Sequence, residues 1–158
     1  MFSFPNPVNE KAARVVAGCV AVLGLVTLLT SWYWLAAVMA VGFALRVASG
    51  PRFSPLGLLA TKVVAPRLGE PAYVAGPPKR FAQALGLVMS AAAALAALAF
   101  GAEGVAGVLL VLLVVAATLE SVFALCLGCQ LFALLMRAGL VPQSVCAECA
   151  DIWSRRPA

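Results

Sequence analysis

The feature that most constrains this sequence is a series of four long apolar runs, at about residues 12–29, 35–48, 81–100 and 105–126. A lipid core about 30 Å thick is crossed by about 20 helical residues, and helices or closed barrels alone satisfy the backbone inside it. The 158 residues are 64% apolar and 11% charged, whereas a soluble domain is about a quarter charged. We therefore predict an all-α protein, a four-span transmembrane helical bundle formed by residues 1–140 and followed by a short tail, 141–158.

The basic residues predict the orientation of this bundle. The turns after the first and third spans contain no Lys or Arg, and Glu103 is their one charged residue. The eleven basic residues all fall on the other side of a four-span model. Basic loops stay in the cytoplasm, so both termini are expected there, in a bacterial inner membrane. The net charge of +5 is thereby assigned to topology and to contact with anionic lipid headgroups, not to nucleic acid.

Two further segments are expected to lie along the membrane surface. Residues 49–79 contain too many prolines for a span, but Ser54 and Pro55 can open a short helix. The leucines and valines that follow would face lipid while Lys62 and Arg67 reach headgroups, which predicts an interfacial amphipathic segment between spans 2 and 3. The fourth apolar run extends past one span, so its remainder, residues 130–138, is expected to bend at Gly128 and lie in the interface.

The candidate chemistry lies at the end of the fourth span. Cys126 and Cys129 are three residues apart, and on one helix they would be about 60° apart and share a face. This spacing suits a reversible disulfide, two ligands of one metal, or simple packing. A second pair, Cys146 and Cys149, extends the pattern to C-x2-C-x16-C-x2-C, which fits a four-thiolate zinc site. We favour the alternative of a thiol relay over metal, while Cys19 in the first span is interpreted as a packing residue.

An acid inside the fourth apolar run, Glu120, is expected to have a partner, because an ionisable group in lipid is costly. The segment from Gly42 to Gly50 resembles the segment around Cys126, and this weak repeat would bring Arg46 to the depth of Glu120. Arg46 is therefore the candidate partner, or it lies beside Cys126 and favours its thiolate. Alternatively, Arg46 extends to the interface and Glu120 bonds to a neighbouring hydroxyl.

Four motifs resemble those of an uncharacterised bacterial family of small integral membrane proteins, a domain-of-unknown-function family. They are FPNPVNE at 4–10, GPRFSP at 50–55, GPPKRFAQ at 76–83 and CLGC at 126–129. The resemblance covers about residues 4–140 and implies a four-helix membrane domain without an established activity. The pair Cys146 and Cys149 lies past the part that carries the resemblance.

The leading functional hypothesis is cytoplasm-facing thiol chemistry, in which the first cysteine pair exchanges electrons or sulfane sulfur with a thioredoxin-like or sulfurtransferase-like protein. Either Cys126 or Cys129 would attack, with Glu120 as proton acceptor and Arg46 as electrostatic support. The alternatives are an oligomeric transporter of a small sulfur species and a structural four-thiolate metal site. The sequence does not identify a cofactor: zinc and a quinone both stay open, and neither is favoured.

Overall fold

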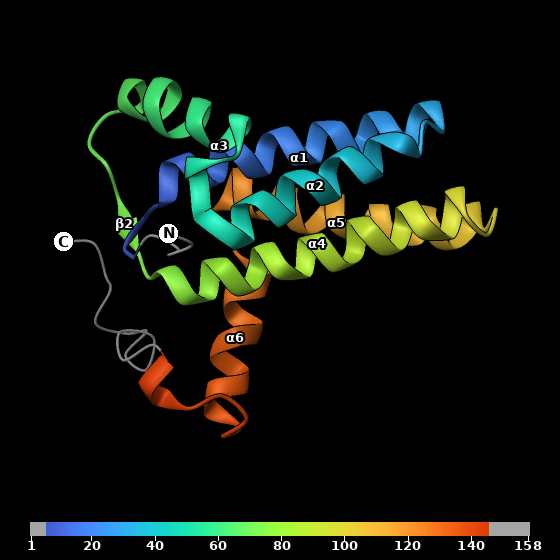
Figure 1. Cartoon of the computed structure of the whole chain (residues 1–158). Helices are drawn as coiled ribbons and strands as arrows, with labels where there is room; N and C mark the ends of the chain where they lie inside the picture. Colours follow the sequence, from blue (N-terminus) through green and yellow to red (C-terminus); the bar gives the residue numbers. More distant parts are fainter. Residues whose placement is uncertain (1–5, 146–158) are drawn as a thin grey trace.

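Four long helices form an antiparallel bundle in the computed structural model, which describes residues 6–145 (Figure 1). They are α1 (Glu10–Thr30), α2 (Trp34–Ser49), α4 (Gly76–Leu98) and α5 (Glu103–Phe123). Each lies in one of four segments that are long and apolar enough to cross a membrane, the second of which continues past α2 to Leu68. The predicted all-α, four-span bundle is confirmed, and the chain is a multi-pass membrane protein.

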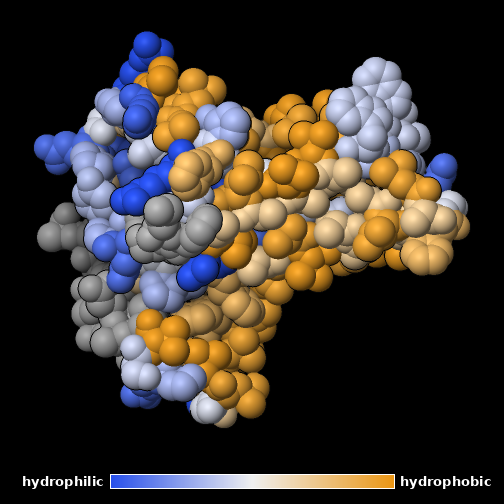
Figure 2. Space-filling model, in the orientation of Figure 1, coloured by the Kyte–Doolittle hydropathy of each residue, from blue (hydrophilic) through white to orange (hydrophobic). Residues whose placement is uncertain are grey.

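Small residues allow the helices to pack closely. Helix α1 lies against α5, and α4 lies against both α2 and α5. Gly86 of α4 meets the Phe43 ring of α2 so closely that an added Cβ would lie 2.5 Å from it. Close approach of this kind replaces the hydrophobic effect as the source of helix association in lipid. Large apolar side chains point outward instead, and Figure 2 shows them as a continuous hydrophobic surface along the bundle.

A two-stranded antiparallel ladder, which the sequence did not predict, fastens the N-terminal segment to the start of α4. Strand β1 (Val8–Asn9) pairs with β2 (Tyr73–Val74), with Val8 opposite Val74. The Asn9 side chain then caps α1 by accepting a 3.0 Å hydrogen bond from the Lys11 N–H. The ladder thus holds the starts of two spans at one end of the bundle.

Most of the segment between α2 and β2 is helical, and the short helix expected after Ser54 is present. It contains a short 3₁₀ turn η1 (Gly50–Arg52), α3 (Pro55–Leu59), a π-helical turn η2 (Ala60–Val64) and a second 3₁₀ turn η3 (Ala65–Leu68). The Ser54 hydroxyl accepts a 3.3 Å bond from the Gly57 N–H and caps α3. In Figure 1 the segment lies at the end of the bundle where α1 begins.

A sharp break separates α5 from α6 (Leu127–Arg137), and a 3₁₀ turn η4 (Gln143–Val145) follows. The predicted bend at Gly128 is wrong: the break is at Ala124, whose φ of 56° is left-handed. The N–H groups of Ala124 and Leu125 both donate to the Leu119 carbonyl, which ends α5. Gly128 lies inside α6 instead, where an added Cβ would be 2.7 Å from the Ala82 Cα. Helix α6 therefore rests on α4 and leaves the bundle at a steep angle (Figure 1).

Candidate functional site

The polar residues of the described part gather at one end of the bundle, which we call the basic end. It consists of the starts of α1, α4 and α6, the ends of α2 and α5, the β ladder and the segment η1–η3. Figure 2 shows the most hydrophilic residues concentrated there, whereas the middle of the bundle is apolar. The Asn6 side chain accepts a 3.0 Å bond from the Gly76 N–H, and the Arg80 Nε donates to the Val47 carbonyl at 3.0 Å. Residues 6–10 of the first motif and the motif at 76–83 therefore lie at the same end of the bundle.

Cys126 and Cys129 form a disulfide at this end of the bundle, with their Cα atoms 5.2 Å apart. They do not lie on one helix as predicted, because Cys126 precedes α6 and serves as its N-cap. Its Sγ accepts a 3.3 Å hydrogen bond from the Cys129 N–H. Cys126 is 8% exposed, whereas Cys129 is half-buried. The two cysteines therefore differ in exposure, and Cys129 is the more exposed residue.

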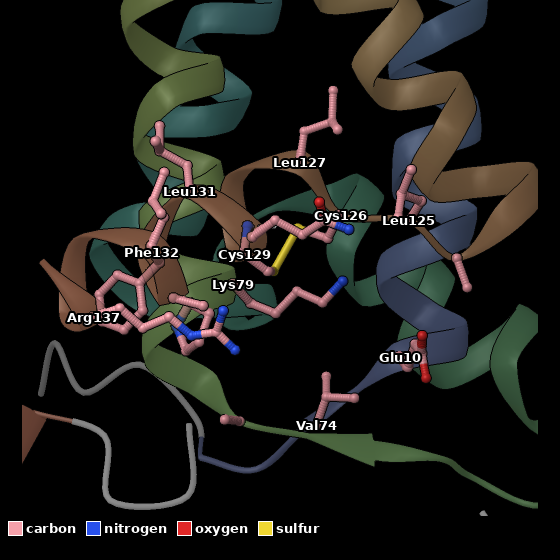
Figure 3. Close-up of a pocket in the computed structure, with 16 residues that line it drawn as sticks. Glu10, Val74, Lys79, Leu125, Cys126, Leu127, Cys129, Leu131, Phe132 and Arg137 are labelled. Atoms are coloured by element: carbon pink, nitrogen blue, oxygen red, sulfur yellow. Dashed lines mark hydrogen bonds between the residues drawn. A yellow bond between two sulfur atoms is a disulfide. The ribbon is translucent and has the colours of Figure 1, made fainter. Parts of the chain in front are cut away.

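The disulfide borders a cavity of about 780 Å³, which we call the cysteine cavity, between α6, β2 and the start of α4. Charged residues from three helices line it as well: Glu10 of α1, Lys79 of α4 and Arg137 of α6. Figure 3 shows the Lys79 side chain extending beside the disulfide, with Glu10 farther away on α1. The pair is thus accessible from a cavity with polar groups in its wall.

The partner of Glu120 is Lys79, and the expected ion pair with Arg46 is wrong. The Lys79 Nζ lies 2.6 Å from the Glu120 Oε1, and the two side chains are 7% and 15% exposed. The pair forms because α4 lies directly against α5, whereas α2 packs on α4. Glu120 also lines a separate cavity of about 270 Å³ together with Cys126. An acid and a base, already paired, therefore flank the disulfide.

Arg46 belongs to another part of the basic end. Its Nε donates to the Gln83 Oε1 at 2.8 Å, and its guanidinium carbon lies 4.6 Å from the centre of the Phe43 ring. It lines a cavity of about 500 Å³ whose wall contains no cysteine of the described residues. The position beside Cys126 that the sequence allowed for Arg46 is instead that of Lys79.

Two basic residues, Lys79 and Arg14, have a place at the site that the sequence did not predict; the sequence indicated only the orientation of the bundle from them. Lys79 is the cation beside the disulfide, and Arg14 donates from Nε to the Ser121 carbonyl at 3.0 Å and from Nη2 to the Val122 carbonyl at 3.2 Å. Arginine near a helix C-terminus satisfies carbonyls that lack an intrahelical partner. Because α1 and α5 are antiparallel, the start of α1 and the end of α5 lie at the same end of the bundle. The four-span topology was the one signal in the sequence from which this contact could have been predicted.

The structure does not test the four-thiolate metal alternative. Cys146 and Cys149 lie outside the described residues, so their distance from the disulfide is not defined. Within residues 6–145 no group of three or more His, Cys, Asp or Glu residues is placed to hold a metal ion. The alternative therefore stays a prediction.

Fold and site together define a multi-pass membrane protein with a cysteine pair at the polar end of its helical bundle. More specifically, the chain belongs to the family described as Domain of unknown function (DUF4395), whose model matches residues 8–137. The match includes the first cysteine pair and ends before the second, and it confirms the family resemblance inferred from the motifs. No curated protein and no solved structure matches the chain.

Proposed function

We propose that this protein exchanges disulfides with a soluble dithiol protein through Cys126 and Cys129. The observation that carries the proposal is the disulfide itself, formed across the first turn of α6 and bordering the cysteine cavity. A disulfide that a partner can reach is suited to exchange, whereas a buried structural one is not.

The difference in exposure indicates the order of the steps. A thiolate of the partner attacks the half-buried Cys129 sulfur, the disulfide breaks, and Cys126 leaves as a thiolate. The first-turn N–H that already donates to the Cys126 Sγ supports that negative charge. The second thiol of the partner then attacks the mixed disulfide, so the partner becomes oxidised and this pair carries two thiols. Two electrons and two protons pass between the proteins, and the exchange is reversible.

Lys79 is proposed to stabilise the thiolate of this cysteine pair, and Glu120 is proposed to accept its protons. Lys79 lines the cysteine cavity, and a cation there favours the leaving thiolate. Glu120 is held by Lys79 and shares a cavity wall with Cys126, which suits a proton acceptor when the pair is reduced. Arg46, which the sequence assigned to this support, lies in the other cavity, so Lys79 takes that role in the proposal.

A thioredoxin-like protein is the proposed partner for electrons, and a sulfurtransferase-like protein is the corresponding donor of sulfane sulfur. In the second case a reduced Cys129 thiolate attacks the outer sulfur of the donor's persulfide and displaces the donor's thiolate. Cys126 then attacks Cys129, the disulfide re-forms and hydrosulfide leaves. Both reactions place the basic end in the cytoplasm of a bacterial inner membrane, in keeping with the positive-inside rule.

Trapping of the mixed disulfide tests the proposal. In Cys126→Ser, made together with Cys146→Ser and Cys149→Ser, the remaining Cys129 thiol should form a stable mixed disulfide with a thioredoxin that keeps only its attacking cysteine, activated as a mixed disulfide with 2-nitro-5-thiobenzoate. Neither the partner nor the cysteine pair then holds a second thiol that resolves the bond. Cys129→Ser in the same background should trap far less, since the remaining thiol is buried. Cys19→Ser, a change on α1 outside the pair, is the control and should behave as the unmodified chain. Equal trapping by the two pair variants contradicts the assigned order, and no trapping by either removes the proposed exchange.

Labelling of the reduced protein tests the orientation. An impermeant maleimide should modify Cys129 in inside-out membrane vesicles and leave it unmodified in right-side-out vesicles. Modification from the opposite side alone would place the pair outside the cytoplasm and exclude the proposed partners.

A further inference from the structure

Arg46 presents a buried positive charge that has no acidic partner in the described part of the chain. The residue is 6% exposed and lies in the last turn of the membrane helix α2. The one salt bridge among residues 6–145 joins Lys79 to Glu120. The contacts of Arg46 are with Gln83, which is neutral, and with the Phe43 ring. Moving a charged side chain out of water without a counter-ion costs a free energy of roughly several kcal/mol.

The two outer nitrogens of Arg46 are not used in hydrogen bonds within the described residues. Among the hydrogen bonds of the described residues, those of Arg46 use Nε and leave Nη1 and Nη2 free. No fully buried side-chain nitrogen or oxygen in this part of the protein lacks a partner. The Nη atoms therefore contact accessible space, and Arg46 lines a cavity of about 500 Å³. We call it the arginine cavity.

The walls of the arginine cavity are mostly apolar, with a few polar groups. It lies between the start of α1, the end of α2 and the segment η1–η3. Ala13 and Val16 of α1 and Pro66 of η3 supply apolar surface. The further polar residues of the wall are Asn9, Thr61, Tyr73, Lys79 and Gln83. A cavity of this size with convergent polar groups in an apolar wall is typical of a ligand site.

We propose that the arginine cavity binds an oxyanion, held by the Nη1 and Nη2 donors of Arg46. A planar guanidinium with two free donors matches the geometry of a phosphate, which two parallel hydrogen bonds can hold. The ligand is either the phosphate of a membrane phospholipid, whose acyl chains would leave along the apolar wall, or free inorganic phosphate. The cavity is at the basic end of the bundle, where we expect the spans to meet the headgroup layer.

Native mass spectrometry of the detergent-solubilised full chain tests the site. The probes are dioleoyl phosphatidylglycerol, inorganic phosphate and dioleoylglycerol, which is a phosphate-free lipid. We expect one tightly bound phosphatidylglycerol, and Arg46→Gln should raise its Kd about tenfold or more, as expected for the loss of charge-assisted hydrogen bonds. Arg80→Gln is the matched control, because Arg80 is exposed and donates to a carbonyl of the same α2 end; its Kd should be unchanged.

A second variant keeps the test valid if Arg46→Gln fails to fold. Ala13→Leu fills the cavity and leaves the guanidinium in place, so it should also remove tight binding. Ala99→Leu, an exposed position at the far end of α4, is its control. Binding of phosphatidylglycerol alone identifies a lipid site, and binding of inorganic phosphate as well identifies a site for the free ion. Equal binding in Arg46→Gln and Arg80→Gln, equal binding of dioleoylglycerol, or no binding of either phosphate probe overturns the proposal.

Discussion

Two cavities share the basic end of the bundle, and they differ in how buried charge is compensated. The cysteine cavity contains Lys79, which is paired with Glu120 at 2.6 Å. The arginine cavity contains Arg46, which has Gln83 as its hydrogen-bond partner and no acid among the described residues. Lys79 lines both cavities, so the two lie next to each other at this residue.

The difference matters because a buried ion pair and a buried lone ion respond differently to substitution. Removing one member of a pair leaves the other charge uncompensated, whereas removing a lone charge relieves a desolvation penalty. In the cysteine cavity the buried cation Lys79 therefore already has its counter-ion, Glu120, within the chain. In the arginine cavity the charge of Arg46 gains a counter-ion when the proposed oxyanion binds. The comparison leads to three predictions, given from the largest expected effect to the smallest.

The largest effect is expected from Glu120→Leu, which leaves Lys79 buried without its partner. We expect a loss of about 3–5 kcal/mol in the free energy of unfolding. Arg46→Met should cost far less, and can even stabilise the phosphate-free protein, because no acid loses its partner. Reversible unfolding in mixed detergent micelles measures both.

The double variant Lys79→Met/Glu120→Leu serves as the control for this pair. It should recover most of the stability lost in Glu120→Leu, since a matched apolar pair replaces a matched ionic one. If the double variant is as unstable as the single one, the ion pair is not the source of the loss. If Arg46→Met destabilises as much as Glu120→Leu, the contrast between the two cavities fails.

The sequence predicted the bundle well because lipid imposes strict rules on composition. The four apolar runs appear as α1, α2, α4 and α5, and the turns without lysine or arginine lie at the end opposite the cysteines. The helical segment before α4 was also predicted, from Ser54 and Pro55, and Ser54 does cap α3. These features depend on local sequence and on the thickness of the membrane, so no knowledge of helix neighbours was needed.

The site was predicted less completely because it depends on which helices are neighbours. The cysteine pair follows from spacing alone, but the partner of Glu120 required knowing that α4 lies directly against α5. The weak repeat suggested Arg46 instead, and this interpretation was wrong. The bend was assigned to Gly128 because glycine favours bends, whereas Gly128 is needed for close contact with Ala82. The left-handed residue is Ala124, and alanine gives no signal of that conformation.

A second prediction concerns the helix contact that positions the disulfide. In Gly128→Ala the new Cβ would lie 2.7 Å from the Ala82 Cα, a backbone atom that cannot rotate away. Helix α6 must shift, at a cost of about 1–3 kcal/mol, and the Cys126 cap shifts with it. We therefore expect faster reduction of the disulfide by a small dithiol, measured by alkylation of the released thiols.

Gly107→Ala is the matched control for this change. Gly107 is also helical, but an added Cβ there meets no atom within 4 Å. The variant should leave the reduction rate unchanged and add up to about 1 kcal/mol of stability through helix propensity. Equal reduction rates in both glycine variants would show that the α4–α6 contact does not control access to the cysteines.

The smallest effect is expected at the rim of the cysteine cavity, where Arg137 is exposed. Exposed charges steer a charged partner but contribute little energy, because water and salt screen them. Arg137→Gln should slow reduction of the disulfide by glutathione, an anionic thiol, about two- to fivefold at low salt. Reduction by 2-mercaptoethanol, whose attacking thiolate carries one negative charge less than that of glutathione, should be slowed less, and the difference should vanish at high salt. Arg52→Gln, an exposed change in η1, should show neither effect. If instead Arg137→Gln slows both reductants equally, Arg137 acts on the structure of α6, and the rim charge of the cysteine cavity has no part in recognising a partner.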